Sequence, residues 1–122
     1  RTTTTRFYWG NDLGTVSIDY NAWFEMNSAA SSHEVEGKNE NAWGLFDISG
    51  NVYEWCQDYY HYSYVGAPTD GSAWLEPATS DRVIRGGCWS SPKNGCRSAY
   101  RDAASPDHSS AEIGFRLVRE RN

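Results

Sequence analysis

Aromatic side chains supply much of the apolar surface that this sequence can bury. Its 122 residues include six tryptophans and eight tyrosines, yet the mean hydropathy is −0.73. The core must therefore come from aromatic rings rather than from aliphatic helices or long Val/Ile strands, and this composition predicts loop-rich packing. A chain of this length forms one domain at most, and such a domain can bury about two-thirds of the surface that its unfolded form exposes.

Short segments, rather than long periodic ones, divide the chain. Two apolar runs at residues 43–48 and 52–55 flank Ser49-Gly50-Asn51, a pattern that predicts a tight turn between buried segments. The other expected elements are an extended lead-in and turn at 2–12, a short helix at 19–26, irregular loops at 27–41 and 61–80, and strands at 82–89, 97–101 and 113–118.

Charge and cysteine content exclude several classes of protein. The net charge is −5, and no run of Lys and Arg interleaves with the aromatic residues, so we do not expect nucleic acid as a partner. Cys56, Cys88 and Cys96 cannot all pair and lack CxxC spacing, which indicates neither a disulfide framework nor a zinc knuckle. No apolar stretch approaches the ~20 residues of a membrane helix.

Three blocks along the chain occur in the order found in one known family. They read NAWGLFDISGNVYEW at 41–55, RVIRGGCW at 82–89 and IGFRLVR at 113–119. These blocks resemble the formylglycine-generating enzyme superfamily, which comprises the sulfatase-modifying factors and many non-catalytic relatives. The resemblance implies an α+β, C-type-lectin-like fold that is loop-rich around a small antiparallel sheet.

The resemblance covers residues 1–122 but corresponds to the C-terminal portion of one such domain. In the family a longer N-terminal region precedes the segment that reads RFYWGND here, at residues 6–12. We therefore expect the missing N-terminal half of the domain to be a partner of this chain. Trp9, Trp23 and Trp43 would otherwise face water in a patch larger than monomers usually expose.

Asp47 and Glu54 place hard oxygen donors on either side of the glycine-centred turn. The family resemblance implies a structural calcium ion here, bound by the side chains of Asp47 and Glu54 and by the carbonyls of Gly50 and Val52. As an alternative, the two carboxylates cap the turn or pair with Arg82 or Arg85.

The thiols needed for the family's chemistry are incomplete. Formylglycine-generating enzymes use a copper-binding cysteine pair just after a Gly-Gly-Ser-Trp/Tyr segment, and copper(I) prefers soft thiolate ligands. In GGCWSSPKNGC, Cys88 takes the place of the family's serine, Ser90 and Ser91 stand where the first catalytic cysteine is expected, and Cys96 alone matches the second. The resemblance thus favours a chain without catalytic residues.

Residues 89–112 resemble the variable region of proteins diversified by diversity-generating retroelements. There, a fixed framework such as RGG.W and IGFR surrounds positions that adenine-directed mutagenesis of Asn-type codons changes. All but a few of the intervening residues are reachable from an AAC codon, and Lys93 and Glu112 are not. A plain surface loop of small residues is the alternative. The predicted ligand-binding residues are Trp89, Ser90, Ser91, Lys93, Asn94, Tyr100, Asp102, Ala103, Ala104, Ser105, His108, Ser109, Ser110 and Ala111.

These observations predict a non-catalytic display domain that binds a protein or cell-surface ligand at a diversifiable C-terminal surface, in a cell-surface or secreted protein. The alternatives are a copper-dependent formylglycine-generating oxidase and a structural subunit. For display, the intervening side chains should lie on one exposed face. The framework residues expected to be buried beneath that face are Trp89, Ile113, Phe115 and Leu117.

Overall fold

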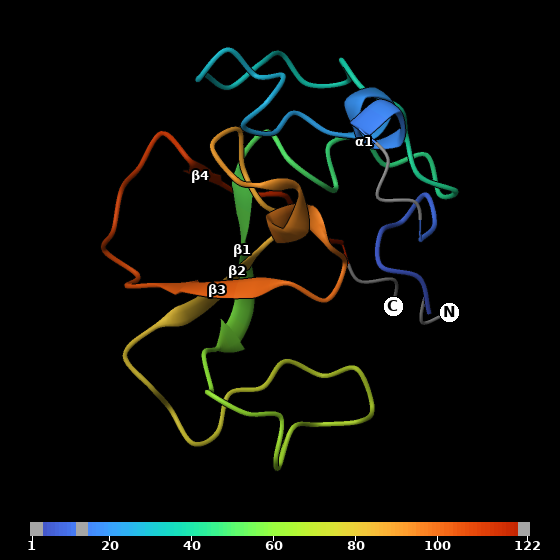
Figure 1. Cartoon of the computed structure of the whole chain (residues 1–122). Helices are drawn as coiled ribbons and strands as arrows, with labels where there is room; N and C mark the ends of the chain where they lie inside the picture. The colour runs from blue at the N-terminus through green and yellow to red at the C-terminus, as the bar shows by residue number, and fades with distance from the viewer. Residues whose placement is uncertain (1–3, 12–14, 120–122) are drawn as a thin grey trace.

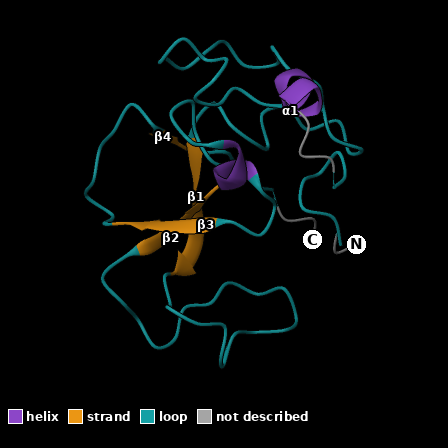
Figure 2. Cartoon of the chain, viewed as in Figure 1, coloured by secondary structure: helices purple, strands orange, loops and turns teal. Residues whose placement is uncertain are grey.

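The computed structural model describes residues 4–11 and 15–119 (Figure 1). Its elements are α1 (Thr15–Asn21), β1 (Tyr53–Tyr59), β2 (Arg82–Arg85), a 3-10 helix (Lys93–Cys96), β3 (Arg101–Ala104) and β4 (Ile113–Gly114). Loops and turns connect these short elements and make up most of the trace in Figure 2, as the composition predicts. Across the described ranges, no helix has the length and apolar character needed to cross a bilayer.

The four strands form one sheet in the order β3-β2-β1-β4. β1 and β2 pair antiparallel, as do β2 and β3, and Ile84 lies opposite Asp102 in the second pair. β4 pairs parallel with β1, where Tyr53 lies opposite Ile113. The predicted α+β class is confirmed. The sheet is mixed rather than wholly antiparallel, because the chain reaches β4 by a crossover and not by a hairpin.

The hydrophobic core lies around α1, away from the centre of the sheet. Phe7, Ile18, Ala22 and Phe24 are buried there together with Cys96 from the 3-10 helix. Trp9 packs against this cluster, and its ring stacks on Phe7 at 4.6 Å between centroids. Aromatic rings thus dominate the core, in agreement with the composition.

Gly50 forms the predicted tight turn because no other residue fits there. Its φ is 75°, and a Cβ at this position would lie 2.3 Å from the carbonyl oxygen of Trp23. The close approach comes from a parallel bridge between Trp23 and Gly50. On the other side, the N–H of Gly50 donates to the carbonyl of Gly86 at 2.8 Å. The turn therefore joins the N-terminal region to the segment after β2.

The helix lies earlier than the predicted range of 19–26. Asn21 ends α1, and its side-chain amide donates to the carbonyl of Ser17 at 2.6 Å. Beyond it, the side-chain oxygen of Asn27 accepts the N–H of Phe24 at 2.9 Å, which stabilises turns where helix was expected.

Two of the three tryptophans expected to face water are partly covered. Trp9 packs on the core. The ring of Trp23 stacks on His33, and the ammonium of Lys38 lies over it, each at 3.7 Å from the ring centroid. Trp43 is 68% exposed. The expectation is therefore wrong for Trp9 and Trp23 and holds for Trp43.

Candidate ligand-binding face

A pocket of about 320 Å³ lies where the chain passes from β3, at one edge of the sheet, to β4, at the other. Figure 1 shows this connection, residues 105–112, as a wide arc beside the strands. Tyr53, Ile84 and Ile113 contribute to the pocket from β1, β2 and β4. The rest of its lining comes from β3 and the connection: Asp102, Ala103, Ala104, Ser105, His108, Ser110 and Glu112.

Backbone hydrogen bonds fix the connection at both ends. The N–H of His108 donates to the carbonyl of Ser105 at 2.9 Å. At the other end, the N–H of Tyr53 donates to the carbonyl of Glu112 at 2.7 Å, which ties the connection to the start of β1. Main-chain groups thus hold both ends of the connection, and among the side chains the Ser110 hydroxyl also accepts the N–H of Glu112 at 3.1 Å. The other side chains can differ more freely.

The pocket brings together six of the predicted ligand-binding residues, namely Asp102, Ala103, Ala104, Ser105, His108 and Ser110. Asp102, Ser105 and His108 are exposed, and the other three are half-buried. Ser109 and Ala111 are exposed on the same connection. One surface therefore unites the second half of the predicted set.

Trp89 and Ser90 form hydrogen bonds with the C-terminal end of this connection, at Ala111 and Glu112. The indole N–H of Trp89 donates to the carbonyl of Ala111 at 3.3 Å, and the hydroxyl of Ser90 donates to the Glu112 carboxylate at 2.5 Å. Ser90 is exposed, whereas Trp89 is half-buried. Both side chains therefore help to hold the connection in place through these hydrogen bonds.

Ser91 is not an exposed ligand-binding residue, and that prediction is wrong. It is 4% exposed, and its hydroxyl accepts the N–H of Cys88 at 2.9 Å and bonds to the hydroxyl of Tyr53 at 3.2 Å. Its carbonyl accepts the N–H of Glu25 at 3.0 Å. A buried hydroxyl with these partners is a structural link.

Tyr100, Lys93 and Asn94 lie outside the lining of the pocket. Tyr100 and Lys93 are half-buried, and Asn94 is exposed on the 3-10 helix. The Tyr100 carbonyl accepts a hydrogen bond from Arg85 at 3.4 Å. The pocket therefore does not include these three predicted residues.

Phe115 and Leu117 are not buried beneath the face, and this prediction is also wrong. They are 76% and 87% exposed. Strand pairing ends at Gly114, so the residues after it are not part of the sheet. Phe115 and Leu117 share one side of the chain, opposite Arg116, but they therefore do not pack against the sheet. Ile113 and Trp89, the other two framework residues, are half-buried.

Sequence reasoning did not select Tyr53 and Ile84 as part of the pocket. Tyr53 begins β1, and burial raises the pKa of its hydroxyl to about 12. Val83 and Ile84 are neighbours in β2, so their side chains point to opposite faces of the sheet, and both are buried. Ile84 lies opposite Asp102, so only knowledge that β2 pairs with β3 could have placed Ile84 in the pocket. The local sequence does not encode that pairing.

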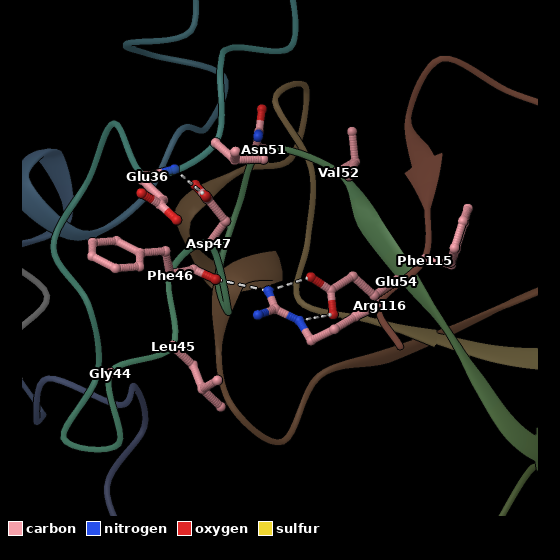
Figure 3. A pocket seen from close by; sticks show the side chains of 11 residues that line it. Glu36, Gly44, Leu45, Phe46, Asp47, Asn51, Val52, Glu54, Phe115 and Arg116 are labelled. Atoms are coloured by element: carbon pink, nitrogen blue, oxygen red, sulfur yellow. Dashed lines mark hydrogen bonds and ion pairs between the residues drawn. The ribbon is translucent and has the colours of Figure 1, made fainter. Parts of the chain in front are cut away.

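Three of the four predicted calcium ligands, Asp47, Val52 and Glu54, line a second pocket of about 330 Å³, whereas Gly50 lies outside its lining (Figure 3). Both carboxylate oxygens of Glu54 accept hydrogen bonds from Arg116, at 2.7 and 2.9 Å, rather than from Arg82 or Arg85. Oδ2 of Asp47 accepts the N–H of Glu36 at 2.8 Å. To bind calcium, Glu54 would have to be released by Arg116 at one oxygen. The calcium site stays a prediction.

The two thiols nearest the family's catalytic positions are inside the protein. Cys88 and Cys96 are 1% and 0% exposed. Burial, with a smaller effect of Cys88, raises the pKa of the Cys96 thiol to about 12. A protonated buried thiol is a poor nucleophile and a poor copper ligand.

Comparison with known proteins agrees with this geometry. Residues 1–121 match the sequence profile of the sulfatase-modifying factor enzyme 1-like domain. The chain belongs to this family. The solved structure of Treponema denticola variable protein 1 superimposes with a TM-score of 0.71 at 32% identity, over 92% of this chain. The sulfatase-modifying factor fold and the resemblance to a variable protein are thus confirmed.

Two curated relatives show how much of a longer protein this sulfatase-modifying factor domain matches. It is 30% identical to the formylglycine-generating enzyme of Streptomyces coelicolor over 127 residues, 94% of this chain and 40% of the enzyme. It is 43% identical to the serine/threonine-protein kinase Pkn1 of Chlamydia trachomatis over 79 residues, 63% of this chain and 13% of the kinase. The superposition covers 40% of the chain of Treponema denticola variable protein 1. The chain therefore spans less than half of each.

Proposed function

We propose that this domain is a non-catalytic binding module that presents residues 102–111 to a protein or cell-surface ligand. The pocket between β3, the 105–112 connection and the strands carries the proposal, because six predicted variable residues line it. Hydrogen bonds of the main chain hold both ends of the connection, so most of its side chains can change without refolding. The structural similarity to Treponema denticola variable protein 1 supports the same function.

The residue types of the pocket suit recognition of a polar protein surface. Asp102 and His108 offer charged or hydrogen-bonding groups, and Ser105 and Ser110 offer hydroxyls. Tyr53 and Ile84 add an apolar floor. A few polar groups over apolar surface are typical of ligand sites.

A library tests this proposal. Asp102, Ala104, Ser105, His108 and Ser110 are varied together by AAC-type codon mutagenesis, and folded variants are selected for binding to an immobilised target protein such as egg-white lysozyme. Binding should be lost when the five parental residues are restored. A control library varies Glu34, Ser63, Thr69, Ser72 and Ala78, which are exposed and lie outside the pocket. Binders should come at least tenfold more often from the first library, and equal yields would contradict the proposal.

Genetic diversification is a separate part of the proposal. It requires a reverse transcriptase gene and a near-identical template repeat beside the coding sequence. Sequencing the locus decides it, because absence of both would leave a binding domain that is not diversified by this route.

We further propose that exposed apolar side chains contact an N-terminal half of the same domain. Trp43, Phe115 and Leu117 are all largely exposed, and the relatives above are longer than this chain. Mixing this chain with a matching N-terminal segment should protect the backbone amides near Phe115 from hydrogen exchange. Unchanged exchange would contradict this contact.

A further inference from the structure

Two arginines lie side by side on the sheet. Arg85 and Arg101 are directly opposite each other in the antiparallel pair of β2 and β3. Ile84 and Asp102, the neighbouring pair, line the pocket described above. Because successive residues of a strand point to opposite faces, the arginine pair belongs to the other face of the sheet. Like charges directly opposite in a sheet repel each other and destabilise it.

Both guanidinium groups converge on Tyr64. Nη2 of Arg85 donates to the Tyr64 hydroxyl at 3.2 Å, and its Nη1 donates to the carbonyls of Ser98 and Tyr100 at 3.4 Å each. The guanidinium carbon of Arg101 lies 4.4 Å from the centroid of the Tyr64 ring and 4.7 Å from that of Tyr60. Tyr64 is 59% exposed, so solvent and solutes reach this cluster. The rings orient the two cations and do not neutralise them.

The nearby carboxylates are engaged elsewhere. Glu54 lies opposite Arg85 in the pair of β1 and β2, but both of its oxygens accept from Arg116. Oδ1 of Asp58 accepts the backbone N–H of Trp74 at 3.1 Å. Within residues 4–11 and 15–119, neither Arg85 nor Arg101 has an ion-pair partner. Two adjacent, oriented positive charges thus lie at the surface of a chain whose net charge is −5.

We propose that Arg85, Arg101 and Tyr64 form a binding site for an oxyanion group, a phosphate or a carboxylate. Guanidinium groups present paired N–H donors that match the oxygens of both anions. The anion would offset the repulsion between the two arginines. This site lies on the face opposite the pocket and does not depend on the proposed function.

The test uses inorganic phosphate and, separately, succinate as probes at constant ionic strength. Isothermal titration calorimetry of the whole chain should show saturable binding to one site for at least one of them. Arg101→Gln and Arg85→Gln should each weaken that binding at least tenfold. Arg6→Gln, at an exposed arginine outside the cluster, should leave it unchanged. Arg101→Lys keeps the charge but loses the planar fork, so its affinity should fall between those of wild type and Arg101→Gln.

The melting temperature provides a second readout. With phosphate, wild type and Arg6→Gln should gain stability, whereas Arg101→Gln should not. If Arg85→Gln does not fold, Tyr64→Phe and Arg101→Lys still report on the site. Binding of neither anion, or binding unchanged in Arg101→Gln, would overturn the proposal. Binding of only one probe identifies which oxyanion the site takes.

Discussion

Glu54 and Arg116 are joined by two hydrogen bonds, 2.7 and 2.9 Å long, that tie β1 to the segment after β4. The same guanidinium donates to the carbonyl of Phe46 at 2.7 Å, so one side chain connects three segments (Figure 3). Both side chains of the ion pair are less than one-third exposed. This geometry makes the pair a structural element of the domain.

Glu54→Gln should lower the free energy of unfolding by about 1–3 kcal/mol, since it weakens hydrogen bonds to a charged, half-buried group. Urea denaturation measures the change, with Glu34→Gln, at an exposed position, as the control. The double variant Glu54→Gln/Arg116→Gln should lose less than the sum of the two single variants. Additive losses would mean that the two residues act independently.

Calcium should raise the melting temperature if it binds at Asp47, Gly50, Val52 and Glu54. Because Arg116 holds both Glu54 oxygens, Arg116→Gln should bind calcium more tightly than wild type, and Glu54→Gln should abolish the effect. Scanning calorimetry over a calcium titration provides the measurement. No shift in either wild type or Arg116→Gln would rule out the site.

Thiol reactivity should follow burial. Iodoacetamide at pH 8 should modify half-buried Cys56 before Cys88 and Cys96, which should react only after unfolding. The pKa of Cys96 is raised from 9.0 to about 12 by burial, so its contribution to stability is complete below pH 9 and is lost as the pH rises towards 12. Mass spectrometry of labelled peptides shows the order, and rapid labelling of native Cys96 would contradict its burial.

The chain should not convert cysteine to formylglycine. Ser90 and Ser91 replace one of the two thiols, and Cys88 and Cys96 are buried. Incubation with copper, oxygen and a Cys-x-Pro-x-Arg peptide should leave the peptide mass unchanged, while the Streptomyces coelicolor enzyme serves as the positive control. Conversion by this chain would restore the oxidase as the better function.

The sequence motifs predicted the fold more reliably than they predicted which side chains are buried. The turn at Gly50 and the strands β1 and β2 follow from local residue types and the family's blocks. The burial of Ser91 depends on its contact with Tyr53, 38 residues away, which no local pattern encodes. Period-two alternation put Phe115 and Leu117 on the same face, but it could not show that pairing stops at Gly114.

Among the predicted ligand-binding residues, those between 102 and 110 other than Ser109 contribute to the pocket, and those between 89 and 94 do not. Residues 102–110 are small or polar between framework residues, and the chain crossing from β3 to β4 brings them together. Ser90 and Ser91 have the same composition, but their hydroxyls bond to Glu112 and Tyr53. Composition alone does not separate a displayed serine from a structural one.

The proposed function requires a face whose side chains can change while the fold persists. The most direct test compares the protease resistance of two displayed libraries, one varied at Asp102, Ala104, Ser105, His108 and Ser110, the other at Tyr53, Ile84, Trp89, Ser91 and Ile113. Single changes in the first set should typically cost under ~0.5 kcal/mol, whereas those in the second remove buried contacts. Most members of the first library should resist protease like the parent, and most of the second should not. Equal loss of resistance in the two libraries would contradict the display function.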